Sequence, residues 1–289
     1  MTRPSIITAT PTAFHPDGSL DLEGSRAILE HIGRSGNEGA FILGTTGEFA
    51  ALTVAERGQV VEAAMEILAD RMRVIVHVGA PSVFEVLQLV EQARAAGATE
   101  IALLTPYYLP ATDAAMLDFF STVDAASEGL DIFVYAYARR SGNSVSTELM
   151  ARLAQLPNVV GAKVSEEPLE QLQAYRGAVP DDFQIYTGAD RDILAVAGVG
   201  AQGVVSGVSS VLPKPFRAAA AAADGDDADA RARAQADVDE ACDVIAGDIA
   251  RMKEAYRVLG VTDTSTRMAI EAPDAATRQL IEDAVRRLG

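Results

Sequence analysis

The stretch Val159-Val160-Gly161-Ala162-Lys163 decides the fold: four uncharged residues precede a lysine, one of three lysines among the 24 basic residues. Such an apolar run predicts a strand that is buried on both faces, as the strands of parallel sheets are. At the end of that strand an ammonium group loses its hydration, and burial favours the neutral amine. Two interpretations of Lys163 follow. It is an amine that attacks a carbonyl carbon to form a Schiff base, or a strand-end lysine whose head reaches solvent.

Short runs of apolar and β-branched residues recur along the whole chain at fairly even spacing. They predict eight strands: Ile6–Thr10, Ala40–Leu43, Val74–Val78, Ile101–Leu104, Ile132–Tyr135, Val159–Lys163, Phe183–Tyr186 and Gly203–Ser206. Segments with apolar residues at three- and four-residue steps lie between them and predict helices, one of which opens with the capping-box pair Thr53 and Glu56. This alternation favours an α/β fold, a (β/α)8 TIM barrel at this length, with a doubly wound open sheet as the alternative.

The helix-like segments indicate two parts of the chain. They are Leu20–Arg34, Val83–Ala96, Ala114–Ala126, Thr147–Leu156 and Leu169–Arg176, followed near the C-terminus by Ala218–Ala223, Asp226–Leu259 and Thr277–Leu288. Pro213 and Pro215 interrupt the alternation, and Asp224–Asp227 is an expected turn. We therefore predict a barrel over residues 1–210 and a C-terminal helical segment over residues 211–289 that packs on it.

Composition limits the partners that this chain can have. Its net charge of −17 argues against nucleic acids and anionic membranes, because an acidic surface repels polyanions. No apolar run reaches the roughly 18 residues of a membrane-spanning helix, and the N-terminus lacks the apolar region of a signal peptide. Cys242 is the only cysteine, so an internal disulfide framework is excluded. These features predict a cytoplasmic protein.

Motifs for a metal or a nucleotide are weak. His15, His31 and His77 share no ligand spacing. Residues 198–203 match the GxGxxG fingerprint, but a helix-like run precedes them and a strand follows. Dinucleotide binding needs the opposite order. We therefore expect neither a metal nor a nucleotide cofactor.

The active site of a TIM barrel lies at the C-terminal ends of its strands, so the residues there are the candidates. They are Gly44–Glu48, Thr105–Tyr108, Tyr135, Lys163 and Thr187–Asp190. The turn from Gly44 to Gly47 offers hydroxyls and backbone N–H groups that suit a small carboxylate, unless it is an ordinary strand-to-helix connection. Tyr135 is either a phenol that relays protons or a packed ring with a satisfied hydroxyl. Tyr107 and Tyr108 could equally form an interface patch.

Taken together, these residues resemble the dihydrodipicolinate synthase / N-acetylneuraminate lyase family of class I aldolases. The resemblance covers nearly the whole chain and rests on Thr10–Phe14, Gly44–Glu48, Pro106–Tyr108, Tyr135, Lys163, Gly203–Ser206, Arg251–Gly260 and the final helix. It implies that Lys163 forms an imine with pyruvate or a longer 2-keto acid. The imine is an electron sink for making or breaking a bond at C3, so no separate cofactor is implied.

The resemblance also implies how the catalytic residues cooperate. Tyr135 would move protons to and from the reaction intermediates. Thr45 would link Tyr135 to Tyr108, and in this family the latter tyrosine comes from the neighbouring subunit. The implied assembly is a homotetramer, a dimer of dimers, in which Tyr108 crosses an interface. The implied partners are a 2-keto acid, pyruvate, and an aldehyde.

A further set of residues is implied to bind the substrate. Thr46 and the N–H groups of its turn, including that of Gly47, would hold the pyruvate carboxylate. The backbone carbonyl of Val205 would face the lysine, and Gly188 would border the substrate. Arg140 falls where the synthases have an arginine that binds the carboxylate of the aldehyde partner, a task for which a planar guanidinium is suited.

Two segments depart from the family pattern. Tyr135–Ala138 lacks the asparagine and proline of the usual Tyr-Asn-x-Pro, and Val164–Glu167 replaces the common Glu-x-(Ser/Thr)-Gly. These departures leave two reactions open, a dihydrodipicolinate synthase-like condensation of pyruvate with an aldehyde and a 2-keto-3-deoxygluconate-type sugar-acid aldolase or dehydratase reaction. A catalytically silent relative that binds a keto acid is a third possibility.

The feedback site of the synthases for lysine is another point of departure. Its histidines would fall at Val54 and Arg57 and its asparagine at Pro81, so that only Glu85 matches. We therefore predict that lysine does not inhibit this protein.

Overall fold

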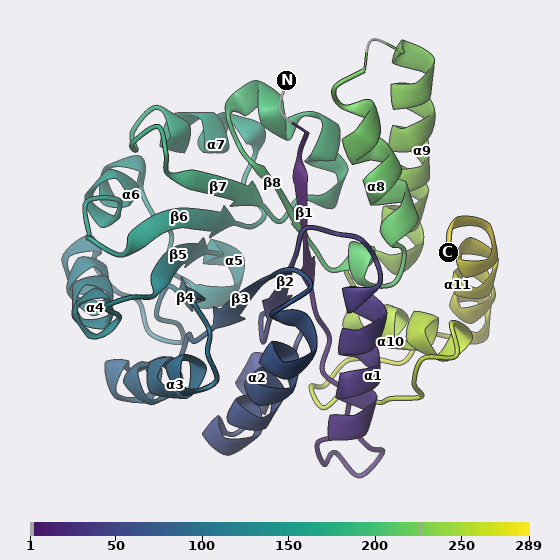
Figure 1. Cartoon of the computed structure of the whole chain (residues 1–289), viewed down its shortest axis with the longest axis horizontal. Helices are drawn as coiled ribbons and strands as arrows, with labels where there is room; N and C mark the ends of the chain where they lie inside the picture. The colour runs from purple at the N-terminus through teal and green to yellow at the C-terminus, as the bar shows by residue number, and fades with distance from the viewer. Residues whose placement is uncertain (1–2, 226) are drawn as a thin grey trace.

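Eight parallel strands close into one barrel in the computed structural model, which describes residues 3–225 and 227–289 (Figure 1). Each strand pairs with the next one, and β8 completes the ring by pairing with β1. The strands are β1 (Ser5–Ala9), β2 (Gly39–Ile42), β3 (Arg73–His77), β4 (Glu100–Leu104), β5 (Asp131–Ala136), β6 (Val159–Val164), β7 (Gln184–Thr187) and β8 (Gly203–Ser206). The predicted (β/α)8 barrel is confirmed, and the predicted strands coincide with the observed ones to within about one residue at most ends.

Helices surround the barrel, and those next to the strands bury their apolar sides against them. In the described chain they are α1 (Leu22–Gly33), α2 (Val54–Leu68), α3 (Val83–Ala95), α4 (Asp113–Ala126), α5 (Ala138–Ser141), α6 (Thr147–Leu153), α7 (Leu169–Arg176), α8 (Pro213–Ala222), α9 (Ala228–Ile245), α10 (Ile249–Val258) and α11 (Ala275–Leu288). The predicted capping box starts α2: the Thr53 side chain accepts from the Glu56 N–H, and the Glu56 side chain accepts from the Thr53 N–H.

The prediction of one helical stretch over residues 226–259 was wrong. Residue 226 lies outside the described residues, and the remainder forms two helices, α9 and α10. Helix α9 ends because Ala246 and Gly247 adopt left-handed backbone angles, with φ of 56° and 63°. The Asp248 side chain then accepts from the Arg251 N–H and caps the start of α10.

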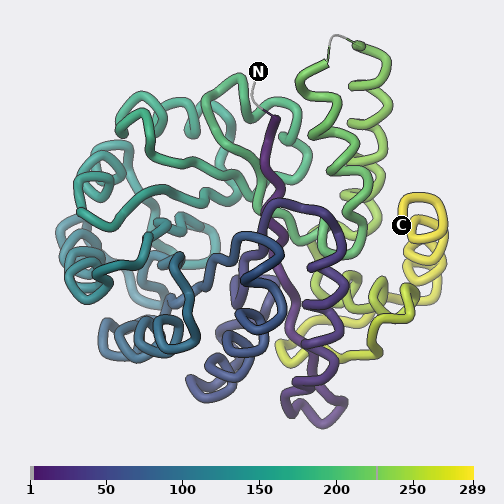
Figure 2. Tube along the Cα trace, in the orientation of Figure 1, coloured from purple at the N-terminus to yellow at the C-terminus, as the bar shows by residue number. Residues whose placement is uncertain are grey.

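Two prolines begin helix α8, although the sequence pattern suggested that they interrupt the alternation. Pro213 and Pro215 lie in its first turn, where a missing backbone N–H is tolerated. Helix α8 packs against β1 and α9, and α11 packs against α9 and α10 on the same side of the barrel (Figures 1 and 2). The division of the chain at residue 210 stays a prediction.

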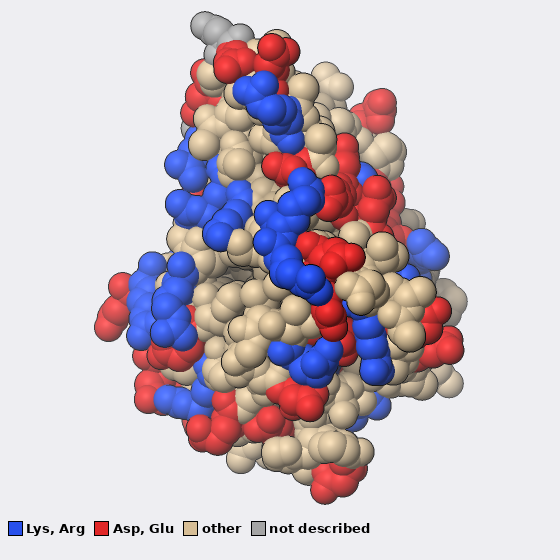
Figure 3. All heavy atoms as spheres, turned by 90° about the vertical axis from the view of Figure 1, so that its right-hand side faces the viewer, with Lys and Arg blue, Asp and Glu red and all other residues tan. Residues whose placement is uncertain are grey.

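The segment between α10 and α11 returns to the loops around the barrel. The Ser265 N–H donates to the Phe14 carbonyl oxygen at 3.0 Å. The outer face of α9–α11 mixes basic and acidic side chains without a large area of one sign (Figure 3). No helix within residues 3–225 and 227–289 has both the length and the apolar character to cross a membrane.

Candidate active site

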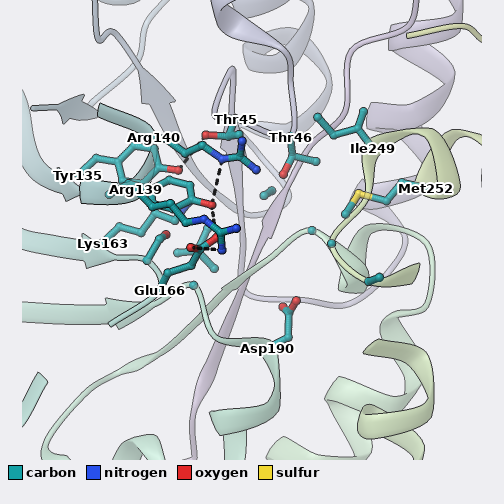
Figure 4. Close-up of a pocket in the computed structure, with 18 residues that line it drawn as sticks. Thr45, Thr46, Tyr135, Arg139, Arg140, Lys163, Glu166, Asp190, Ile249 and Met252 are labelled. Atoms are coloured by element: carbon teal, nitrogen blue, oxygen red, sulfur yellow. Dashed lines mark hydrogen bonds and ion pairs between the residues drawn. The ribbon is translucent and has the colours of Figure 1, made fainter. Parts of the chain in front are cut away.

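A cavity of about 370 Å³ opens where the barrel strands end. It is lined by Ala9, Thr45, Thr46, Tyr135, Tyr137, Arg139, Arg140, Lys163, Ser165, Glu166, Gly188, Asp190, Val205, Gly207, Ala246, Gly247, Ile249 and Met252 (Figure 4). Thus seven residues proposed from the sequence meet around one cavity, although they come from six different strand ends or loops. They are Thr45, Thr46, Tyr135, Arg140, Lys163, Gly188 and Val205.

Lys163 lies inside the barrel mouth. Its side chain extends from β6, where Lys163 is the register partner of Tyr135 on β5. The ammonium nitrogen Nζ lies 4.0 Å from the centroid of the Tyr135 ring and 4.8 Å from that of Phe41. Only 7% of the residue is exposed. The amine therefore borders the cavity and two aromatic rings and does not extend into bulk solvent.

The Tyr135 hydroxyl points to the turn after β2. Its oxygen lies 3.1 Å from the Thr45 hydroxyl oxygen, a hydrogen bond in which either group can donate. The ring packs edge-on against Phe41 and against His77, whose ring centroid is 5.7 Å away. Burial lowers the pKa of His77 well below its usual value, so a neutral imidazole stands behind the tyrosine. The packing fixes the phenol while its hydroxyl stays at the cavity.

The turn that carries Thr45 and Thr46 is closed by its own backbone. The Gly47 N–H donates to the Gly44 carbonyl oxygen at 3.0 Å, and the Glu48 N–H donates to the Thr45 carbonyl oxygen at 3.0 Å. Gly47 lies outside the cavity lining, so its predicted contact with a substrate carboxylate stays a prediction. Thr46 does line the cavity and presents a hydroxyl near α10 (Figure 4).

Two glycines let other groups approach the cavity closely. A Cβ atom on Gly188 would lie 2.5 Å from the Ser165 Oγ atom. A Cβ atom on Gly207 would lie 2.7 Å from the Met252 methyl carbon and 3.3 Å from the Thr46 Oγ1 atom. Side chains at these positions would displace residues that shape the cavity.

The two segments that depart from the family pattern contact each other at the cavity mouth. The Tyr137 hydroxyl donates to Glu166 Oε1 at 2.6 Å, and Arg139 donates to Glu166 Oε2 at 3.0 Å. Arg140 Nε donates to the Tyr137 hydroxyl oxygen at 3.4 Å (Figure 4). Arg140 is therefore at the cavity, as predicted, but its guanidinium already contacts a phenol.

Asp190, one of the candidates that follow the predicted strands, also lines the cavity, whereas sequence reasoning missed the C-terminal helices as parts of it. Asp190 follows β7, and its Oδ1 atom is buried without a hydrogen-bond partner. Burial raises the pKa of Asp190 to about 6. Ala246, Gly247 and Ile249 come from the turn between α9 and α10, and α10 itself adds Met252. No pattern in these short apolar residues indicated a site.

Tyr108 lies outside the cavity of its own chain. It is 90% exposed. Leu109 beside it and Phe84 at the start of α3 are also largely exposed. Its backbone φ of 80° is unusual for a residue with a side chain and costs energy, as is often seen at functional positions. A second cavity of about 160 Å³ borders Thr45 and Arg140.

Within residues 3–225 and 227–289, no group of three or more His, Cys, Asp or Glu side chains is arranged to hold a metal ion. The fold and the cavity define a class: this is a (β/α)8 barrel with a buried lysine and a tyrosine in one cavity at the ends of its strands.

Comparisons with known proteins narrow the class. The profile of the dihydrodipicolinate synthetase family matches residues 3–287. The chain is 33% identical over 213 residues to 4-hydroxy-tetrahydrodipicolinate synthase of Synechococcus elongatus, which covers 74% of this chain and 71% of that protein. It is 32% identical over 267 residues to 4-hydroxy-tetrahydrodipicolinate synthase 2 of Streptomyces coelicolor, covering 92% and 85%.

A solved structure agrees over almost the full length. The 4-hydroxy-tetrahydrodipicolinate synthase of Methylacidiphilum fumariolicum SolV superposes with a TM-score of 0.89 at 25% identity, covering 99% of this chain and 95% of that one. The chain belongs to the dihydrodipicolinate synthetase family. It is accordingly a lyase or synthase of the Schiff-base aldolase kind.

Proposed function

We propose that this protein is a pyruvate-dependent class I aldolase that joins pyruvate to an aldehyde, in the manner of 4-hydroxy-tetrahydrodipicolinate synthase. One observation carries the proposal: the Lys163 amine is buried at the cavity against Tyr135, whose hydroxyl contacts Thr45. A buried amine can act as the nucleophile in imine formation, and a phenol that is hydrogen-bonded to a hydroxyl can move the protons. The names of the relatives point to the same chemistry.

The first half of the reaction activates pyruvate. The Lys163 nitrogen attacks the keto carbon C2 and forms a C–N bond, and the keto oxygen takes up protons and leaves as water. The resulting iminium withdraws electrons from C3. A C3 proton then leaves, and the electron pair of the C–H bond moves toward the iminium nitrogen to give an enamine. Tyr135, at 4.0 Å from the amine to its ring centroid, is the group that carries these protons.

The second half makes the carbon–carbon bond. The enamine C3 attacks the aldehyde carbon, and the aldehyde oxygen takes up a proton and becomes a hydroxyl. Water then adds to the iminium carbon, the C–N bond breaks, and Lys163 is released with the keto product. The same steps in reverse cleave a 2-keto acid. Thr45, hydrogen-bonded to Tyr135 at 3.1 Å, is placed to return protons to the phenol.

Hydrogen-bond donors around the lysine bind the pyruvate carboxylate in this proposal. The Thr46 hydroxyl and the backbone of its turn are the donors, while Gly188 and the Val205 carbonyl shape the opposite wall. Local donors are needed because the net charge of −17 repels anions from the surface as a whole. The lysine imine is the electron sink, so the proposed chemistry uses no metal or cofactor. We also propose that the enzyme is cytoplasmic.

Assembly completes the site in this proposal. The exposed Tyr108, with its strained backbone, would enter the second cavity of a neighbouring subunit and approach Thr45 there. Its phenol would extend the chain of hydroxyls that begins at Tyr135. The exposed Phe84 and Leu109 would be covered by the same contact, which accounts for apolar side chains at the surface. We propose a homotetramer built as a dimer of such dimers.

One observation favours the second candidate, a 2-keto-3-deoxygluconate-type sugar-acid aldolase reaction. Glu166 stands beside Arg140 at the mouth, where a synthase binds the carboxylate of its aldehyde. A 2-keto-3-deoxygluconate-type sugar-acid aldolase would need hydroxyl-binding groups at that place instead. Both reactions share the imine at Lys163.

Trapping the imine tests the shared chemistry. The enzyme is treated with pyruvate and borohydride, digested, and searched by mass spectrometry for the reduced pyruvate adduct. We expect the adduct on the peptide containing Lys163, none in Lys163→Arg, and an unchanged yield in the matched control Lys214→Arg, because Lys214 is exposed at the start of α8. Absence of the adduct from the native enzyme would leave a catalytically silent binding protein.

A further inference from the structure

The cavity mouth carries a cluster that the imine chemistry does not use. Tyr137, Arg139 and Arg140 come from the end of β5 and the short helix α5, and Glu166 comes from the loop after β6. All four side chains line the cavity: Tyr137 and Arg139 donate to the Glu166 carboxylate, and Arg140 donates to the Tyr137 hydroxyl oxygen (Figure 4). The cluster and Lys163 line the same cavity, so an aldehyde that meets the enamine there can contact the cluster.

The backbone holds Glu166 in this place at a cost. Its φ of 57° is a left-handed angle that a residue with a Cβ adopts reluctantly. The side chain is 40% exposed, yet both carboxylate oxygens are engaged, one by Tyr137 and the other by Arg139. Although burial acts to raise its pKa, the hydrogen bond from Tyr137 and the pairing with Arg139 bring the pKa below its usual value. Glu166 is therefore an anion at neutral pH.

We infer, on the basis of the proposed aldolase function, that the Tyr137–Glu166 pair selects an uncharged, hydroxylated aldehyde and excludes one that carries a carboxylate. A substrate carboxylate at Arg140 would lie near the anionic Glu166. Repulsion between like charges at close range would lower the affinity for such a substrate several-fold or more. Arg140 is in addition partly occupied, because its Nε already donates to the Tyr137 oxygen.

Hydroxyl groups fit the same cluster better than a carboxylate does. A hydroxyl can donate to Glu166 and accept from Arg140, so a chain of hydroxyls uses the acceptors and the donors together. The cluster therefore favours neutral polar groups over an aldehyde that carries a carboxylate.

The test compares two probe aldehydes with pyruvate as the common partner. The probes are glyceraldehyde, which is neutral and hydroxylated, and succinate semialdehyde, which carries a carboxylate. The measured quantity is the ratio of their kcat/KM values in the native enzyme, in Glu166→Gln and in the control Glu167→Gln. Glutamine keeps a hydrogen-bond acceptor for Tyr137 but removes the charge, and Glu167 does not line the cavity.

We expect the native enzyme to favour glyceraldehyde and Glu166→Gln to reduce that preference about tenfold, with Glu167→Gln unchanged. A native preference for succinate semialdehyde, or a ratio that Glu166→Gln does not alter, would overturn the inference. Borohydride trapping with pyruvate alone is done on every variant. An adduct at Lys163 together with the wrong aldehyde preference rejects only the role of Tyr137 and Glu166, whereas a missing adduct rejects the aldolase itself.

Discussion

Lys253 Nζ donates to Glu48 Oε1 across 2.6 Å, and neither side chain is exposed by more than 2%. The pair joins α10 to the turn that presents Thr45 and Thr46. The second Glu48 oxygen accepts from the backbone N–H groups of Arg267 and Met268, at 2.9 and 2.7 Å. One carboxylate therefore ties the C-terminal segment to the turn that carries Thr45 and Thr46, so the extension and the barrel together shape the cavity.

Removing the lysine of this pair leaves an anion buried without its partner. We expect Lys253→Met to lower the free energy of unfolding by about 3–5 kcal/mol, because an uncompensated buried charge costs far more than a surface pair contributes. Urea unfolding followed by circular dichroism measures it. Lys214→Met is the control, since Lys214 is exposed and its replacement should change stability by less than about 0.5 kcal/mol. Equal stability of the two variants would contradict this account.

Most of the barrel could be predicted from the sequence, because its strands are apolar throughout, whereas apolar residues in its helices recur every three or four positions. The start of α2 was predictable for a local reason, the reciprocal bonds of Thr53 and Glu56. The break between α9 and α10 was not. Ala246 adopts a left-handed angle there, and alanine carries no signal for such a conformation.

The site was predictable only in part, since sequence order places residues on strand ends but not the contacts between their side chains. Lys163 and Tyr135 follow from strand position and resemblance. The contact between Tyr137 and Glu166 does not, because it depends on two loops whose conformations are set by tertiary packing. A usable signal existed, however: both residues fall in the two segments that depart from the family pattern.

The hydroxyl pair at the lysine predicts two graded losses of activity. Tyr135→Phe keeps the ring beside Lys163 but removes the proton carrier, so kcat should fall by roughly 10²–10⁴-fold. Thr45→Val removes the partner of the phenol, while Thr45→Ser keeps a hydroxyl and should retain most activity. Steady-state rates of aldol addition measure all three. A Thr45→Val enzyme as active as Thr45→Ser would show that the hydrogen bond to Tyr135 is dispensable.

The partly buried Asp190 predicts a pH dependence of stability. Its pKa rises to about 6 in the folded protein from 3.8, because burial outweighs the nearby charges of Lys163 and Arg191. Well below pH 3.8 the residue is protonated in both the folded and the unfolded states and costs nothing. As pH rises from about 4 to about 6 the unfolded state ionises more readily, so this residue progressively reduces stability, by roughly 3 kcal/mol at neutral pH.

Replacing Asp190 by asparagine removes that dependence. The stability of Asp190→Asn relative to the native protein should therefore increase between pH 4 and pH 7, as measured by urea unfolding at several pH values. Asp182→Asn, at an exposed position before β7, is the control and should show no such trend. A difference that stays constant with pH would mean that Asp190 titrates alike in the folded and unfolded chains.

Lysine should not regulate this enzyme. Arg57 stands where the feedback site of the synthases would have a histidine, and its guanidinium is buried and donates to the carbonyl oxygens of His77 and Gly79, at 2.8 and 3.0 Å. A fixed cation there repels the ammonium groups of free lysine. Initial rates with and without millimolar lysine should agree within error. Strong inhibition would refute the prediction.

The proposed exchange of Tyr108 between subunits predicts that two inactive variants restore each other. In Lys163→Arg the lysine is lost and Tyr108 is kept, whereas Tyr108→Phe has the opposite defect. Each variant alone should keep only a small residual activity. If Tyr108 serves the neighbouring site, a mixed dimer contains one complete site, formed by the lysine of one chain and the tyrosine of the other.

Random mixing, by unfolding and refolding the two variants together, should therefore recover about a quarter of the native activity per chain, because half of the dimers are mixed and each has one working site. Size-exclusion chromatography verifies that both variants assemble like the native protein. If Tyr108 instead serves its own chain, every site in the mixture lacks one of the two groups, and the activity stays at the level of the separate variants. The exposed position of Tyr108, outside the cavity of its own chain, favours the first outcome.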